Sequence, residues 1–204
     1  MIAICDYGMG NRRSVEKALE HVGASTVVTA DHDVLRSADG VILPGVGAFP
    51  EAMRNVMALG LDDLLRDVAA DGTPLLGICL GMQLLFERST EFEGAAGLGL
   101  LPGDVTPLRA PKLPHIGWNL VALERPSVLT EGLGGAAAFY HVHSFACRPS
   151  EQGDVVGRGT YGEPFASIVE RGPVFGVQFH PEKSSRDGLA LLANFATACA
   201  RVAA

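Results

Sequence analysis

Thr73-Pro-Leu-Leu-Gly-Ile-Cys-Leu-Gly-Met-Gln83 reads as an apolar strand that turns into a helix. Gly77 and Gly81 stand two positions on either side of Cys79, a pattern typical of a sharp strand-to-helix turn in which close backbones leave no room for a Cβ. At the apex of such an elbow, helix amides favour a thiolate over a thiol. Cys79 is therefore a candidate nucleophile, and the alternative is a small buried apolar side chain.

The first half of the chain alternates strand and helix signals around this elbow. Strands are predicted at residues 2–6, 25–30, 40–44 and 74–78, and helices at residues 14–22, 31–37, 50–70 with a break at Gly60, and 81–88. This alternation predicts right-handed crossovers and a mostly parallel sheet with helices on both faces.

The second half is rich in Gly and Pro between residues 94 and 166. Short β-like runs at residues 140–147, 154–157 and 165–169 predict antiparallel strands added to the parallel sheet. An apolar strand at residues 174–179 and an amphipathic helix at residues 187–202 close the chain. With no repeat or linker in view, we predict a single α/β domain over residues 1–204.

Composition narrows the classes of function. The chain has 204 residues, is 48% hydrophobic and carries a net charge of −7, with Arg12-Arg13 as its main basic cluster. Nucleic acid and anionic membranes are therefore disfavoured as partners. The four cysteines lack the spacing of a disulfide framework or a zinc site. With neither a signal peptide nor a membrane span in the sequence, we expect a cytoplasmic protein with reduced thiols.

A base for Cys79 is expected in Gln178-Phe-His-Pro-Glu182, at the end of the last apolar strand. Ligands of parallel sheets bind at the carboxyl ends of the strands, where both motifs lie. Pro181 would direct the chain so that the Glu182 carboxylate turns back to the imidazole of His180 and holds Nε2 toward the thiol. A lone histidine would indicate a surface residue, but the His-Pro-Glu group favours function.

His143, in Tyr140-His-Val-His143, is the rival base. Residues two apart on a strand share a face, which is also a spacing of metal ligands. No nearby Asp, Cys or third His completes a metal site, so we expect no metal. Without an adjacent carboxylate, His143 suits a structural or substrate-lining role better than that of a base.

Acyl chemistry at Cys79 also needs donors for an oxyanion. The backbone N–H of Leu80 is one candidate, because it follows the nucleophile at the start of the helix. The loop Pro44-Gly-Val-Gly47 could provide the second, since its glycines allow a peptide to face either way. The alternative is an ordinary turn between strand and helix, because the loop lacks the spacing of a dinucleotide-binding motif.

Together these motifs resemble the class I, or triad, glutamine amidotransferases, and imply their flavodoxin-like fold. Within that family the chain is most similar to the glutaminase subunits of imidazole glycerol phosphate synthase. This closer resemblance is carried by Asp6-Tyr-Gly-Met-Gly-Asn11, Leu43-Pro-Gly-Val-Gly-Ala-Phe49, Pro114-His-Ile-Gly-Trp-Asn119, Tyr140-His-Val-His-Ser144 and Gln178-Phe-His-Pro-Glu-Lys-Ser184.

The resemblance implies that Cys79 attacks the glutamine carboxamide, that His180 passes a proton to the leaving ammonia, and that Glu182 orients His180. It implies no cofactor. The oxyanion hole would consist of Leu80 and the Val46–Gly47 peptide. Glutamine would be held by Gly47, Gln83, Ser144 and Phe145.

The resemblance also implies a partner, a (β/α)8 cyclase that receives the ammonia through a sealed route in a heterodimer. The docking face would carry Asn11, Trp118, Asn119, Tyr140 and Lys183. A single tryptophan is often a core residue, but the polar surroundings of Trp118 favour an interface hot spot. Arg12 and His141 depart from the family pattern near this face.

Three rival interpretations stay open. The chain could serve another triad amidotransferase, such as one for pyridoxal phosphate or GMP synthesis, although the Pro-His-x-Gly-Trp-Asn segment argues against both. It could be a cysteine peptidase or another hydrolase on the same scaffold. A non-catalytic regulatory partner is disfavoured because Cys79, His180 and Glu182 occur together.

Overall fold

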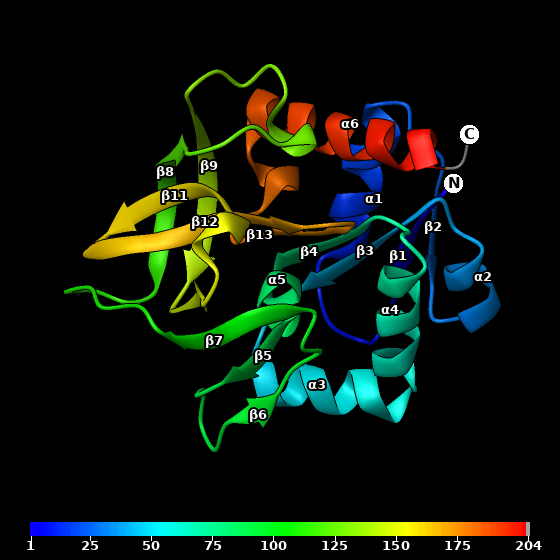
Figure 1. The fold of residues 1–204 in the computed structure, drawn as a ribbon, viewed down its shortest axis with the longest axis horizontal. Coiled ribbons are helices and arrows are strands. Elements are labelled where there is room, and N and C mark those ends of the chain that lie inside the picture. The colour runs from blue at the N-terminus through cyan, green and yellow to red at the C-terminus, as the bar shows by residue number, and fades with distance from the viewer. Residues whose placement is uncertain (203–204) are drawn as a thin grey trace.

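The main sheet of the computed structural model, which describes residues 1–202, has nine strands in the order β2-β1-β3-β4-β13-β12-β11-β8-β9 (Figure 1). Its parallel part consists of β2 (Thr26–Thr29), β1 (Ile2–Cys5), β3 (Gly40–Gly45), β4 (Leu75–Cys79) and β13 (Val174–Val177). Antiparallel pairing extends it through β12 (Glu163–Arg171), β11 (Val155–Tyr161), β8 (His115–Leu123) and β9 (Ala136–His143). The predicted fold class, a parallel sheet with antiparallel strands added from the second half, is confirmed.

Helices cover both faces of the parallel part. On one face lie α1 (Arg12–His21) and α6 (Ser185–Val202), and on the other α3 (Phe49–Ala58), α4 (Leu61–Ala70) and α5 (Leu80–Leu84), as Figure 1 shows. The short α2 (His32–Arg36) follows β2. At the predicted break, Gly60 joins α3 to α4 with a φ of 64°, which glycine adopts without a steric cost.

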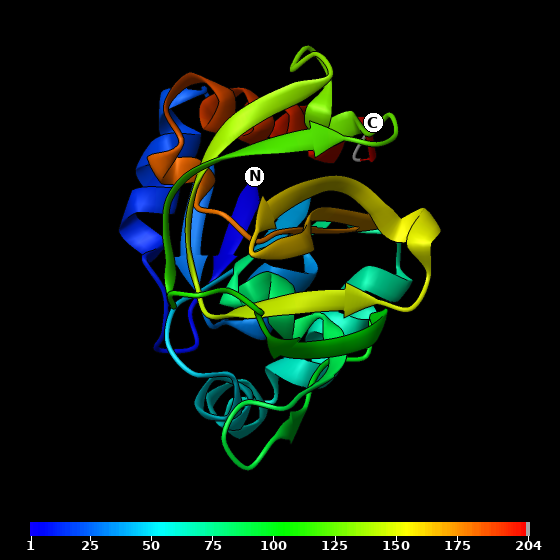
Figure 2. The same cartoon turned by 90° about the vertical axis from the view of Figure 1, so that its left-hand side faces the viewer.

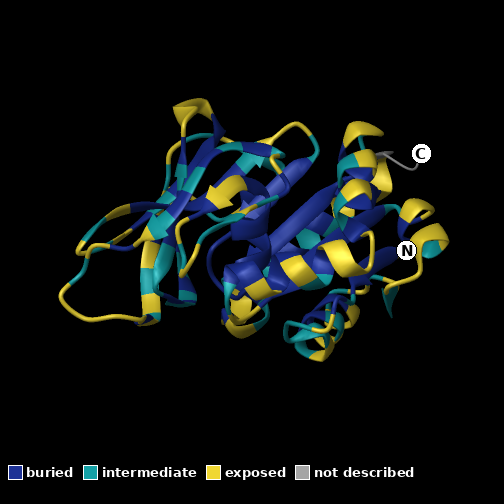
Figure 3. Ribbon diagram, turned by 90° about the horizontal axis from the view of Figure 1, so that it is seen from below, coloured by how far each residue is buried: buried dark blue, intermediate teal, exposed yellow. Residues whose placement is uncertain are grey.

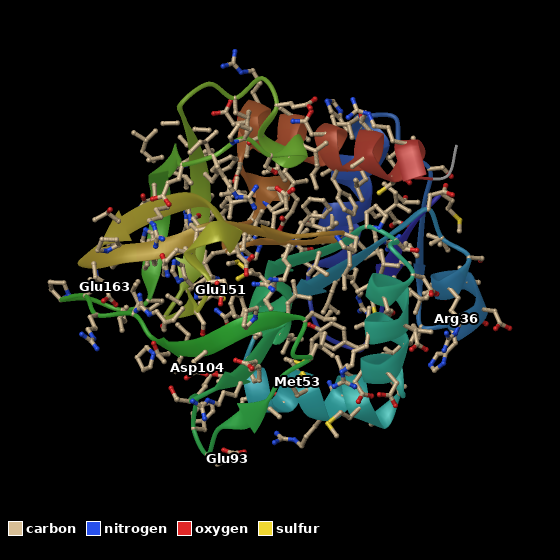
Figure 4. All side chains as sticks on the ribbon, in the orientation of Figure 1. Arg36, Met53, Glu93, Asp104, Glu151 and Glu163 are labelled. Atoms are coloured by element: carbon tan, nitrogen blue, oxygen red, sulfur yellow. The ribbon has the colours of Figure 1, made fainter. Side chains whose placement is uncertain are left out.

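Apolar side chains on both faces explain the burial of the central strands. Ile4 and Ile42 pack with the α1–α6 layer, whereas Ala3 and Val41 pack with the α3–α4 layer. Successive strand residues point to opposite faces, so strands between two helical layers are apolar throughout. Figure 3 accordingly shows these strands in the colour of buried residues, with exposed residues on the outer sides of the helices. Met53 of α3, labelled in Figure 4, belongs to this buried interior.

A second, four-stranded sheet was not predicted. It contains β10 (Phe145–Pro149), β7 (Leu101–Pro107), β5 (Phe86–Ser89) and β6 (Ala95–Ala96) in that order, and β10 and β7 are seen side by side in Figure 2. Two sequence predictions are corrected here. The helix predicted for residues 81–88 ends at Leu84, and the strand predicted for residues 140–147 divides between two sheets at Ser144.

The second sheet is the physical reason for both corrections, because β5 and β10 both pair with β7 in it. Phe86 is fully buried in the second sheet, where β5 pairs with β7, so the chain leaves the helix to place it there.

Short 3-10 turns connect the remaining parts: η1 (Val128–Thr130), η2 (Gln152–Asp154) and η3 (Pro181–Lys183). Among the helices of residues 1–202, none combines the length and apolar character needed to cross a membrane.

Candidate active site

Cys79 stands at the apex of a strained turn between β4 and α5. Its backbone has φ 56° and ψ −110°, a conformation that residues other than glycine rarely adopt. The elbow is tight, because a Cβ at Gly81 would lie 1.8 Å from the carbonyl oxygen of Leu43. The Cys79 sulfur lies 3.7 Å from the carbonyl oxygen of Val142 and 3.9 Å from Nε2 of Gln178. The thiol is thus held in place at the carboxyl edge of the sheet, as the sequence predicts for an elbow.

His180 lies beside Cys79 and is oriented by Glu182. Nδ1 of His180 lies 3.0 Å from Oε1 of Glu182, and the two side chains are only 5% and 1% exposed, respectively. The backbone N–H of His180 donates to the carbonyl of Tyr140 at 2.9 Å, which fixes the segment after β13 against β9. The second carboxylate oxygen of Glu182, Oε2, is buried and has no hydrogen-bond partner among residues 1–202.

The proton on His180 is stabilised by its two neighbours. Burial lowers the pKa of His180, but hydrogen bonds and charge interactions with Cys79 and Glu182 outweigh burial and raise the pKa to about 10. Because this pKa lies above the ordinary value of 6.5, His180 carries a proton at pH 7 and loses it only as the pH rises toward 10. An imidazolium therefore faces the sulfur, ready to donate.

Replacing Glu182 with glutamine is expected to lower the pKa of His180, because a neutral amide no longer stabilises the imidazolium. The protonated form should then be lost at a lower pH than in the parent chain. Glutamine hydrolysis should fall by about 100-fold or more, as when the orienting carboxylate of other triads is removed. The imidazole NMR titration of His180 and the rate of glutamate release measure both effects.

Glu93→Gln is the matched control, because it makes the same chemical change at a side chain that is 68% exposed and pairs with Arg54 on the surface. It should leave the His180 titration and the rate unchanged. An unaltered His180 pKa in Glu182→Gln would show that the carboxylate does not stabilise the imidazolium.

A pocket of about 290 Å³ opens onto the sulfur. Most of the predicted catalytic, oxyanion and glutamine-binding residues meet there, although they come from distant parts of the sequence. Its walls are formed by Val46, Gly47, Cys79, Leu80, Gln83, Glu91, Pro114, Val142, His143, Ser144, Phe145, His180 and Lys183. Glu182 lies behind His180 and completes the group.

The loop predicted to contribute to an oxyanion hole borders this pocket. Gly47 has a φ of 105°, and a Cβ there would lie 2.7 Å from Cε of Met9. Val46 is 42% exposed. Opposite the loop, Leu80 begins α5 directly after the nucleophile, so its N–H belongs to the first turn of the helix.

Two of the glutamine-binding candidates, Gln83 and Phe145, are hydrogen-bonded to each other in the pocket wall. Nε2 of Gln83 donates to Oε1 of Gln178 at 3.2 Å and to the carbonyl of Phe145 at 3.3 Å. Ser144 and Phe145 occupy the point where the chain leaves the main sheet for the second sheet. This crossing forms one wall of the pocket.

Glu91 and Gln178 are candidate site residues that the sequence analysis missed. Glu91 lines the pocket, and its Oε2 accepts the backbone N–H of Phe49 at 2.7 Å. Gln178 belongs to the Gln-Phe-His-Pro-Glu motif, and its fully buried amide contacts both Gln83 and Cys79. Nothing in the sequence around Glu91 distinguishes it from a surface carboxylate.

The structure places the docking-face residues on different surfaces. Trp118 is 56% exposed and lies between Ile116 and Leu120, which excludes the core alternative for this side chain. Tyr140 stands opposite Trp118 in the β8–β9 ladder, with ring centroids 6.1 Å apart. Burial alternates along β8, so the Asn119 side chain lies on the opposite face from Trp118.

The other predicted docking residues lie at the pocket and at the start of α1. Lys183 is exposed at the pocket rim and Asn11 precedes α1. Arg12, which departs from the family pattern, forms an ion pair with Asp6. Within residues 1–202, no three His, Cys, Asp or Glu side chains are arranged to hold a metal ion.

The family model "Glutamine amidotransferase class-I" matches residues 3–199. The chain belongs to this family, and is thus an enzyme of the glutamine amidotransferase class. A crystal structure of a glutamine amidotransferase shares the fold, with a TM-score of 0.78 at 20% identity over 98% of both chains.

Relatives identify the branch of the family. An imidazole glycerol phosphate synthase subunit HisH from Moorella thermoacetica is 54% identical over 195 residues, covering 95% of this chain and 93% of that protein. A HisH subunit from Bacillus cereus is 52% identical over 197 residues, covering 96% of this chain and 93% of its own. The chain is therefore a member of the HisH subunits, which confirms the resemblance drawn from the motifs.

Proposed function

We propose that this chain hydrolyses L-glutamine at Cys79 and supplies the ammonia to a (β/α)8 cyclase subunit of imidazole glycerol phosphate synthase, in histidine biosynthesis. The observation that carries the proposal is the buried His180–Glu182 pair, 3.0 Å apart, beside a thiol at a strained elbow. The identity to HisH subunits supports the choice of pathway.

The geometry supports a two-step acyl transfer. With the proton of the Cys79 thiol held on His180, the sulfur attacks the carboxamide carbon as a thiolate. The developing oxyanion faces the N–H of Leu80 and the Val46–Gly47 peptide. His180 donates its proton to the departing nitrogen, which leaves as ammonia and a thioester on Cys79. Water then attacks the thioester while His180 accepts a proton, and glutamate is released.

The pocket wall supports recognition of the amino-acid end of glutamine. We propose that Gly47, Gln83, Ser144 and Phe145 hold this end, partly through backbone groups. Glu91 suits the α-ammonium group, because one of its carboxylate oxygens is engaged by Phe49 and the side chain lines the pocket. A carboxylate gives a charge-assisted hydrogen bond to an ammonium.

Steady-state glutamate release from glutamine, measured with and without the ligand-loaded cyclase, tests the proposal. We expect slow hydrolysis by the chain alone and faster hydrolysis in the heterodimer, because the two-glycine loop can change the direction of its peptide. Cleavage of peptides without hydrolysis of glutamine would favour the alternative cysteine hydrolase. The four described cysteines are free, which suits the cytoplasmic location that we propose.

Trp118→Ala is expected to weaken binding of the cyclase by about 30-fold or more, as truncation of an aromatic hot spot does. The reason is the exposed apolar row of Ile116, Trp118 and Leu120 on β8, which a partner would cover. Calorimetric titration with the cyclase measures this effect.

Phe92→Ala is the control for the loss of exposed apolar area, because Phe92 is 79% exposed and lies outside the proposed face. Its affinity for the cyclase should not change. Unchanged affinity in Trp118→Ala would remove this residue from the docking face, while the melting temperature reports whether the fold is intact.

A further inference from the structure

Two buried histidines connect β8 to the wall of the candidate glutamine pocket. Nδ1 of His115 lies 3.0 Å from Nε2 of His143, and Nδ1 of His143 lies 2.8 Å from the carbonyl oxygen of Phe145. At the other end, Nδ2 of Asn119 lies 3.3 Å from Nε2 of His115. We call this chain of three side chains, Asn119, His115 and His143, the histidine relay.

Each proton in the relay has only one possible position. The carbonyl of Phe145 can only accept, so His143 carries its proton on Nδ1 and accepts on Nε2. His115 must therefore donate from Nδ1, which leaves its Nε2 as an acceptor for the Asn119 amide. The orientation of that amide is fixed independently, because Nδ2 also donates to the carbonyl of Thr160 at 2.9 Å.

Burial keeps both rings in this neutral form. It lowers the pKa of His143 to about 4 despite the hydrogen bond to the carbonyl of Phe145, and the His180 imidazolium and any proton on His115 act in the same downward direction. Burial also lowers the pKa of His115. Because both pKa values are lowered, each imidazole is neutral at neutral pH and gains a second proton only under acidic conditions.

The far end of the relay is a backbone group of the pocket wall. The carbonyl of Phe145 accepts from both His143 and Gln83, at 2.8 and 3.3 Å. Phe145 begins β10, directly after Ser144 and the crossing between the sheets. The neighbouring carbonyl of Ser144 accepts from the N–H of Leu108, directly after β7, at 2.9 Å, whereas the carbonyl of Phe145 is held by these two side-chain donors.

We propose that the histidine relay positions the Ser144–Phe145 wall for glutamine binding, and that Asn119 acts as its anchor rather than only as a docking contact. The proposal rests on the proposed function, since it assigns Ser144 and Phe145 to the glutamine pocket. Asn119 and His115 are absent from the pocket wall and act through His143, so they are positioning residues.

His115→Phe tests the hydrogen bond of His115 separately from the packing of its ring. A phenyl ring can keep the stack on Tyr161, whose centroid lies 4.1 Å from that of His115, but it cannot hydrogen-bond to His143. We expect the KM for glutamine to rise about tenfold, the effect of losing one well-placed hydrogen bond. The kcat and the rate of Cys79 alkylation by iodoacetamide should stay within about twofold, because the relay does not contact the sulfur.

His141→Phe is the matched control. His141 is equally deep in the same imidazole cluster, but it hydrogen-bonds to Ser167 and Phe139 and has no part in the relay. Its KM should match that of the parent chain. An equal rise of KM in both variants, or no rise in His115→Phe, would overturn the relay and leave only a packing role.

Two substitutions of Asn119 test the direction of the protons. In Asn119→Ala, water can take the place of the amide at His115, and the tautomers can stay as they are. In Asn119→Asp, a carboxylate accepts from Nε2 of His115, which reverses both tautomers and removes the donor to Phe145. The KM for glutamine should therefore rise about tenfold in Asn119→Asp and clearly less in Asn119→Ala.

All variants are assayed as full chains with a saturating amount of cyclase, so that a lost docking contact cannot change the apparent KM. An equal KM in Asn119→Ala and Asn119→Asp would overturn the proton ordering. Cys79→Ala is included to separate the two proposals. Glutamate release by that variant would overturn the proposed function together with the relay. If Cys79→Ala is inactive but His115→Phe and Asn119→Asp keep the parent KM for glutamine, the relay alone would be overturned.

Discussion

Cys79→Ala is expected to abolish glutamine-dependent synthesis, with a loss on the order of 10⁴-fold or more. The thiol at the elbow is the proposed nucleophile, and alanine leaves no sulfur there to attack the carboxamide. The substitution removes one sulfur atom that borders an open pocket and so creates no enclosed cavity, and the fold should be retained. Synthesis from added ammonia should continue, because that reaction takes place on the cyclase.

The measurement is product formation by the heterodimer, first with glutamine and then with an ammonium salt. Cys199→Ala is the control: Cys199 is also buried, but it packs in the core with α1 and α6, away from the pocket. It should retain both activities. Glutamine-dependent turnover in Cys79→Ala would show that Cys79 is not the nucleophile, and loss of both activities would point to a failure of assembly.

Local sequence signals predicted the elbow and its partners because their physical causes are local. Gly77 and Gly81 are needed where backbones touch, and Pro181 places a carboxylate two residues from His180. Parallel strands then bring their carboxyl ends to one edge of the sheet. The approach of Cys79 and His180 also requires β13 to lie next to β4, an order that the alternation of strands and helices does not specify.

Other features depend on contacts that no local signal carries. Residues 140–147 are β-like throughout, and only the presence of a second sheet divides them at Ser144. The Gly-Trp-Asn motif predicts a docking role for both Trp118 and Asn119, but neighbouring strand residues point to opposite faces. The position of Glu91 in the pocket depends on its contact with the backbone of Phe49, at the start of α3.

Gly81→Ala is expected to have the largest effect on stability. The added Cβ would lie 1.8 Å from the carbonyl oxygen of Leu43 and 2.8 Å from its carbonyl carbon. These atoms belong to the backbone of β3 in the middle of the sheet and cannot move aside as a side chain would. The free energy of unfolding should fall by about 3 kcal/mol or more, at the upper end of overpacking effects, as measured by urea denaturation.

The same clash should reduce activity even under conditions where the variant is folded. Relieving it requires α5 to move away from β3, yet the first turn of α5 carries the Leu80 N–H and the end of β3 leads into the Val46–Gly47 loop. The two donors of the proposed oxyanion hole would separate, and a shift of about 1 Å in such a site costs on the order of 100-fold in rate. Gly135→Ala, where a Cβ meets no atom within 4 Å, should change neither stability nor rate. If Gly81→Ala were as stable and as active as Gly135→Ala, the close approach of the elbow to β3 would not be needed for either the fold or the site.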